Sequence, residues 1–125
     1  MTNDAAPDDQ RVPQPKAFKA FGSLRGVIKF KETSANEVSM SEETICDVPP
    51  GAEILMLGTS GLHFGFKADE DHHIQSLQYR LHWDWVPGEP GKRKFYALWN
   101  FRDVSGDDSR GGEVTFEVLY GIPYA

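Results

Sequence analysis

The sequence of 125 residues contains a single cysteine and no long apolar run. One cysteine excludes a disulfide within the chain and any zinc site built from several thiolates. No stretch approaches the roughly 20 apolar residues that span a bilayer, and the polar N-terminus lacks the basic and apolar parts of a secretory signal. We therefore expect a soluble protein with no membrane partner and the cytoplasm as its default location, with release or assembly into a particle as the alternative.

Positive charge is also scarce. Lysine and arginine together number 13, against 19 aspartate and glutamate residues, which gives a formal net charge of −6. Proteins that bind nucleic acids neutralise phosphates with clustered cations. The charge balance therefore disfavours nucleic acid as a partner.

Residues 1–17 differ in composition from the rest of the chain. They contain three prolines among aspartate, asparagine and glutamine, with too little apolar material to offset the entropy cost of ordering. We predict a flexible polar arm over 1–17, which in an assembly could lie on a neighbouring subunit. Residues 18–125 are then one domain, large enough to bury about two thirds of its unfolded surface.

From residue 18 onward the sequence reads as short strands separated by turn residues, and no segment has the periodicity of an amphipathic helix. Clusters of proline, glycine and serine mark turns at 48–51, 58–61, 86–91 and 105–112. The predicted strands are 24–31, 37–40, 43–47, 53–57, 62–67, 74–86, 94–104 and 113–120. About eight such strands predict an all-β fold, an antiparallel β-sandwich of jelly-roll or Greek-key type.

The most regular strand runs from Leu77 to Trp85, where apolar and polar residues alternate without a break. Its apolar face, both tryptophans included, is assigned to the core. A return through residues 87–91 would pair Trp83 with Phe95, and a second hairpin through 106–112 would pair Phe101 with Phe116, because these registers bury only apolar residues. The resulting meander has as its core face Leu77, Tyr79, Leu81, Trp83, Phe95, Trp99, Phe101, Phe116 and Val118.

The same registers gather polar and aromatic residues on the outer face of this sheet. Such a face could receive a sugar or pack against another protein, and the alternative is an ordinary solvated face with cross-strand charge pairs. Two neighbouring leucines, Leu98 and Leu119, argue against the solvated face, because exposed apolar pairs suggest cover by a partner. The candidate ligand-binding residues are Arg80, His82, Tyr96, Asn100 and Glu117.

Two other segments carry potential metal ligands. Asp69–His73 combines carboxylates with imidazoles, but adjacent strand residues point to opposite faces, which favours a solvated turn. The glycine-rich loop with Asp103, Asp107, Asp108 and Ser109 resembles a calcium loop in composition and lacks its spacing. We expect neither a metal nor a cofactor in these segments.

The sequence contains little evidence for a catalytic site. His82 and Asp84 share a face, but no serine or cysteine has the context of a nucleophile, and Cys46 is typical of a small core residue. Only Glu117 among the carboxylates faces the candidate site, so a pair for acid–base chemistry is missing. The glycines match neither dinucleotide nor phosphate-loop motifs. We expect that the protein is not an enzyme.

From Val48 onward the order of elements resembles the small H-type lectin domain. The resemblance rests on the segment 52–58 after a proline-containing turn, the alternating strand 74–85, the aromatic strand 95–101 followed by Arg102 and Asp103, and a last strand with Val114, Phe116, Val118 and Tyr120. In that family, such sandwiches form trimers that bind N-acetylgalactosamine-type sugars between subunits. The resemblance implies a homo-oligomeric sugar-binding protein, and it transfers no binding residue.

Three functions follow from these patterns. The favoured one is a non-enzymatic β-sandwich binding module, homo-oligomeric, that recognises carbohydrate or a protein surface. The second is a structural assembly protein, such as a virion or particle component, whose arm reaches a neighbour. The third is a small cupin-like or calycin-like enzyme that uses a metal with His72, His73 or His82.

Overall fold

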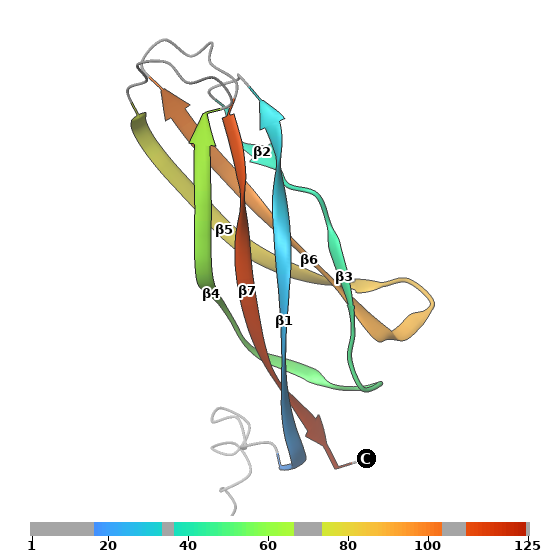
Figure 1. Cartoon of the computed structure of the whole chain (residues 1–125). Coiled ribbons are helices and arrows are strands. Elements are labelled where there is room, and N and C mark those ends of the chain that lie inside the picture. Colours follow the sequence, from blue (N-terminus) through green and yellow to red (C-terminus); the bar gives the residue numbers. More distant parts are fainter. Residues whose placement is uncertain (1–16, 34–36, 67–73, 104–109, 125) are drawn as a thin grey trace, which may run out of the picture.

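The computed structural model describes residues 17–33, 37–66, 74–103 and 110–124, and these residues form strands without any helix (Figure 1). None of them therefore makes a helix that is long and apolar enough to cross a membrane. The seven strands of this part of the chain are β1 (Phe18–Thr33), β2 (Ser39–Met40), β3 (Thr44–Asp47), β4 (Glu53–Phe66), β5 (Ile74–Val86), β6 (Glu89–Asp103) and β7 (Arg110–Pro123).

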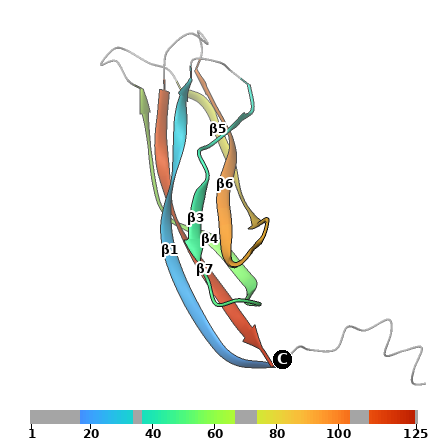
Figure 2. The same ribbon diagram turned by 90° about the vertical axis from the view of Figure 1, so that its right-hand side faces the viewer.

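The strands form two antiparallel sheets, consistent with a β-sandwich. Sheet A has the order β1-β7-β4, and in sheet B β6 pairs with β5 on one side and with the short β2 and β3 on the other. Seen from the side, the two sheets lie as two layers (Figure 2). The expected all-β, antiparallel class is confirmed.

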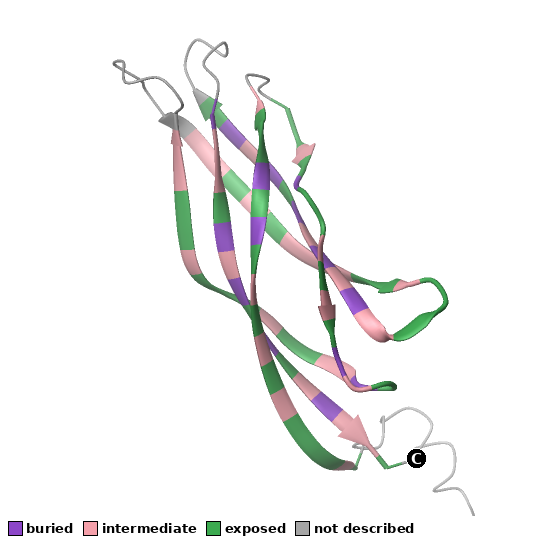
Figure 3. Cartoon of the chain, turned by 45° about the vertical axis from the view of Figure 1, so that its right-hand side comes forward, coloured by how far each residue is buried: buried purple, intermediate pink, exposed green. Residues whose placement is uncertain are grey.

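The core lies between the sheets and consists of alternate residues from both. Figure 3 shows buried positions alternating with exposed ones along β1, β6 and β7, the pattern of strands with one face inward. Rings from opposite sheets meet there, with 4.8 Å between the centroids of Phe95 and Phe116 and 5.2 Å between those of Phe30 and Trp99. The buried cluster comprises Ile28, Phe30, Phe95, Ala97, Trp99, Phe101, Val114, Phe116 and Val118.

The predicted hairpin of β5 and β6 is confirmed in its register. Trp83 lies opposite Phe95, and the pairing continues unbroken along both strands from Ser76 to Trp85. The turn is tighter than the predicted five residues, because β6 already begins at Glu89. Pro87 and Gly88 make it, and Gly88 has a φ of 76°, a value that glycine adopts without steric cost.

The predicted second hairpin is wrong. β7 does not pair with β6 but crosses to the other layer, where it is the central strand of sheet A between β1 and β4. Phe116 and Val118 do face the core, from the opposite wall. The alternation of apolar and polar residues along a strand determines which side chains point to the core. It does not determine which of the two sheets the strand belongs to.

Three further predictions need correction. The turn expected at 58–61 lies within β4, which continues through irregularities in its pairing with β7, so two predicted strands are one. β1 begins at Phe18, six residues earlier than the strand predicted from residue 24. Trp85, assigned to the core, is 53% exposed because it stands at the hairpin end, beyond the cover of sheet A.

The predicted N-terminal arm is not among these corrections. Residues 1–16, which make up most of it, lie outside the described residues.

Candidate functional site

The outer face of sheet B brings together four of the five predicted binding residues. Along β5 and β6, Arg80 lies opposite Leu98 and His82 opposite Tyr96, while Asn100 follows in the next row beside Gln78. Residues paired in this way project to the same face of a sheet. The predicted pairs of facing residues between β5 and β6 are therefore confirmed.

Glu117 does not belong to this group. It projects from β7 on the outer face of sheet A, where its carboxylate accepts a hydrogen bond from Arg25 Nη2 at 3.2 Å. Leu119, predicted to lie beside Leu98, moves to sheet A with it and sits opposite Ser23. Both misplacements follow from the incorrect second hairpin.

The short strands β2 and β3 extend the outer face of sheet B with apolar side chains that the sequence did not reveal. Met40 pairs with Leu98, and Ile45 pairs with Lys94. Val38, just before β2, is 67% exposed, Ile45 55%, Met40 44% and Leu98 37%. We call this surface the β6 face, and it consists of Val38, Met40, Ile45, Arg80, His82, Tyr96, Leu98 and Asn100.

A hollow of about 370 Å³ opens on the β6 face. Val38 and Leu98 give it an apolar side, whereas Arg80 and Asn100, together with Gln78, supply polar groups. Arg80 is exposed and makes no ion pair within the described part of the chain. The hollow thus combines an apolar wall with an uncompensated cation.

Two polar atoms of the β6 face lack hydrogen-bond partners. His82 Nε2 and Asn100 Oδ1 are shielded from solvent and find no partner among the residues that the structure describes, and the same holds for Arg93 Nε and Trp99 Nε1 elsewhere. A buried polar atom left unpaired costs roughly 1–3 kcal/mol. The His82 and Tyr96 rings stack with centroids 5.4 Å apart and an interplanar angle of 15°. One face of the tyrosine ring is therefore already occupied.

Charged residues border the β6 face at its β3 end. Lys94 Nζ lies 3.5 Å from Glu43 Oε2, and Lys92 Nζ donates a hydrogen bond to Asp47 Oδ1 at 2.7 Å. This hydrogen bond, with the negative charge of Asp47, raises the pKa of Lys92. All four side chains are at least partly exposed, so both pairs add little stability and form a solvated border.

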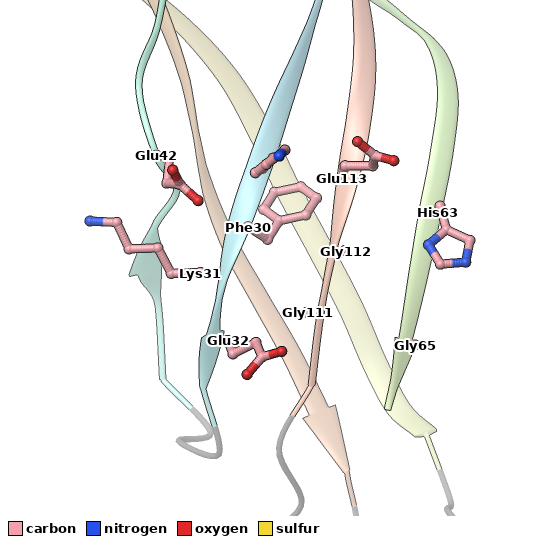
Figure 4. A pocket seen from close by; sticks show the side chains of 10 residues that line it. Phe30, Lys31, Glu32, Glu42, His63, Gly65, Gly111, Gly112 and Glu113 are labelled. Atoms are coloured by element: carbon pink, nitrogen blue, oxygen red, sulfur yellow. The ribbon is translucent and has the colours of Figure 1, made fainter. Parts of the chain in front are cut away.

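A second hollow, of about 540 Å³, lies over sheet A and is drawn in Figure 4. Lys29, Glu113 and His63 stand in one row across β1, β7 and β4. Gly65 and Gly111 line the next row, where the absence of side chains creates the depression. Two lysines and three glutamates line this hollow, so charges of both signs surround it.

Candidate metal ligands and the single cysteine are the other groups to which the sequence assigned potential chemistry. Among the described ranges, no group of three histidine, cysteine or acidic residues is arranged to hold a metal. Two predicted segments lie outside the described residues, Asp69–His73 and Asp107–Ser109. The first contains His72 and His73, which the third functional hypothesis uses as metal ligands. Cys46 is half-buried against the core, and its burial, followed by the charge of Asp47, raises the pKa of the thiol. A raised pKa is the opposite of nucleophile activation.

Comparison of the chain with protein-family models, with curated proteins and with solved structures gave no match.

Proposed function

We propose that the chain is a non-enzymatic β-sandwich module that recognises a protein surface through the β6 face. The observation that carries this proposal is the row of exposed apolar side chains on β2 and β6 beside the unpaired Arg80. Apolar side chains at the centre of a contact, with arginine and tyrosine among them, are typical of protein interfaces.

A protein partner suits the β6 face better than a sugar does. Sugars bind where aromatic rings present an open face beside several hydrogen-bonding groups, whereas the exposed groups here are mainly aliphatic. The Tyr96 ring, the face's aromatic candidate for stacking, lies parallel to His82. The dominant contribution to binding would therefore come from burying Val38, Met40, Ile45 and Leu98.

The hollow specifies the partner further. Its apolar wall accepts one aliphatic or aromatic side chain, and Arg80 beside it can pair with a carboxylate. A charged hydrogen bond that forms in a partly desolvated hollow discriminates between partners more than it adds affinity. We expect a partner segment with an apolar residue next to an aspartate or glutamate.

A random peptide library displayed on phage tests this proposal. Peptides selected on the wild-type protein should contain an apolar residue beside an acidic one. Leu98→Asp and Arg80→Ala should each weaken the selected peptides at least tenfold, equivalent to about 1.4 kcal/mol. Met56→Asp is the matched control, because Met56 is 65% exposed on sheet A and should leave binding unchanged.

Two results would contradict the proposal. Selected peptides that bind Leu98→Asp as well as they bind the wild type would show that the β6 face is not used. Binding on a glycan array that Tyr96→Ala abolishes, without any peptide selected, would assign the face to carbohydrate instead.

A further inference from the structure

The two sheets end in strand edges that differ in how they are protected. Sheet A is bordered by β1 and β4, and sheet B by β5 on one side and by β2 and β3 on the other. An edge strand presents backbone N–H and C=O groups that can pair with another chain, and proteins usually block such edges with bulges, prolines, charges or covering segments.

The β1 edge is covered by the chain that follows β2 and by the first residue of β3. The N–H of Glu42 donates to the carbonyl of Lys29 at 2.9 Å, and Thr44 Oγ1 donates to the carbonyl of Val27 at 2.6 Å. The neighbouring edge of sheet B is interrupted, because β2 has two residues and β3 four, with Pro49 and Pro50 following. Neither edge offers a continuous row of backbone groups.

The β4 edge is irregular. Its pairing with β7 shifts register between Ile54 and Met56 and again between Thr59 and Gly61. Such shifts bend and twist a strand, which hinders the addition of another strand. β5 crosses β4 at an angle (Figure 1), and the Tyr79 hydroxyl donates to Thr59 Oγ1 at 3.0 Å where they approach.

β5 is less protected over its middle part. Its register shifts lie only at its two ends, between Ile74 and Ser76 and between Trp85 and Val86, and the charged residues between them, Arg80 and Asp84, have opposite signs. It contains neither proline nor lysine, and its register with β6 is regular from Ser76 to Trp85. Within the described ranges it has a hydrogen-bonded neighbour on one side only, which is β6. Over these ten residues its second edge therefore has no strand partner within the described part of the chain.

The side chains of β5 are complementary to a second copy of the same strand. In an antiparallel pair with its two-fold axis at His82, Arg80 lies opposite Asp84 of the second copy, and this contact occurs twice. On the inner face of the sheet, Leu81 lies opposite Trp83 of the second copy and Tyr79 opposite its Trp85. Opposite charges and apolar pairs in facing positions stabilise antiparallel strands.

Trp85 is the residue that such a pairing would cover. Its ring packs on the buried guanidinium of Arg93, with 3.8 Å from Cζ to the ring centroid, and lies edge-on to Trp83 at 5.5 Å. Although held on one side, it remains 53% exposed. A large ring fixed in place and partly exposed loses little entropy when a partner buries it.

We propose that two copies of the chain associate through β5, in antiparallel register with the two-fold axis at His82. The two B sheets then form one continuous sheet, and the two β6 faces lie side by side on it. The dimer does not rest on the proposed binding function, because it forms between copies of the protein without any ligand.

Cross-linking tests the register. In a Cys46→Ala background, His82→Cys places two thiols directly opposite each other at the axis, within the reach of a disulfide. Treatment with oxidised glutathione should convert most of this variant to a covalent dimer. Gln78→Cys is the matched control, because residue 78 faces Val86 of the second copy and its two thiols lie far apart.

Charge reversal tests the contact itself. By sedimentation equilibrium, Arg80→Asp and Asp84→Arg should each raise the dimer dissociation constant at least tenfold, and the double variant should restore it to within about threefold. Arg102→Asp, exposed on β6, should leave the wild-type constant unchanged. Arg80 takes part in both proposed contacts, so its variants do not separate them. Leu98→Asp does, because it should weaken peptide binding at least tenfold and leave the dimer intact.

The proposal is overturned by a wild-type protein that stays monomeric up to several hundred micromolar. Efficient cross-linking at position 78 in place of 82 would overturn it too, as would a double charge reversal that fails to restore association.

Discussion

The two long sides of the sandwich are built differently. On the side where β1 meets β3, side-chain and backbone donors of Glu42 and Thr44 reach the carbonyls of β1 across the gap between the sheets. On the side where β4 meets β5, the hydroxyl of Tyr79 makes the hydrogen bond to Thr59. One side is thus closed by hydrogen bonds to the backbone of β1, and the other leaves a strand edge unpaired within the described residues.

The difference lies in how firmly each side ties the two sheets together. The segment that closes the first side includes Ser41, which is 1% exposed and whose Oγ accepts from the Ala97 N–H at 2.7 Å and donates to the Glu42 carbonyl at 2.8 Å. Ser41 thereby ties the chain between β2 and β3 to β6 while Glu42 ties it to β1. The open side has no comparable link within the described residues, and the proposed dimer uses the edge on this side.

The largest effect is expected from removing the link on the closed side. Ser41→Ala leaves the Ala97 N–H buried without an acceptor, which should lower the free energy of unfolding by about 2 kcal/mol. Urea unfolding would measure the change. Ser39→Ala is the control, because its hydroxyl makes only a 3.4 Å contact with the Glu37 carbonyl, and it should change stability by less than about 0.5 kcal/mol. Equal effects at both positions would refute the assigned role of Ser41.

A smaller effect distinguishes the two sides directly. Thr44→Val removes the donor to the Val27 carbonyl on the closed side and should cost about 1 kcal/mol. Tyr79→Phe removes the hydroxyl contact on the open side, where water can replace it, and should cost only a few tenths of a kcal/mol. Both variants keep the shape of the side chain, so urea unfolding compares the hydrogen bonds. A larger loss for Tyr79→Phe would reverse the comparison.

The sequence was sufficient to predict the hairpin of β5 and β6. Its strict alternation leaves one register that buries only apolar residues, and the Pro87–Gly88 turn closes it locally. The sheet to which β7 belongs could not be predicted in this way. Phe116 and Val118 face the core whether β7 lies beside β6 or opposite it, so both arrangements satisfy the same pattern.

The candidate site shows the same limit. Arg80, His82, Tyr96 and Asn100 come from the local hairpin and are brought together as predicted, whereas Glu117 depended on the long-range pairing of β7. Met40 and Ile45 were missed for a related reason. Their strands are two and four residues long, and the sequence does not say that they lie beside β6.

The smallest expected effect concerns Cys46 on β3, and it tests how closely the closed side packs on the core. Burial raises the pKa of this thiol above its ordinary value of 9.0, so the folded protein retains the proton to a higher pH than the unfolded chain does. The unfolded state then binds fewer protons in this range, and stability falls as pH rises from about 9 through the raised pKa. Cys46→Ala lacks this contribution. Urea unfolding should therefore show that the wild-type protein loses stability relative to Cys46→Ala between pH 8 and pH 10.5. All other titrating groups are common to both proteins and cancel in this comparison. A pH-independent difference would mean that β3 leaves the thiol as accessible as in the unfolded chain, and the contrast between the closed and the open side would then rest on Ser41 and Thr44 alone.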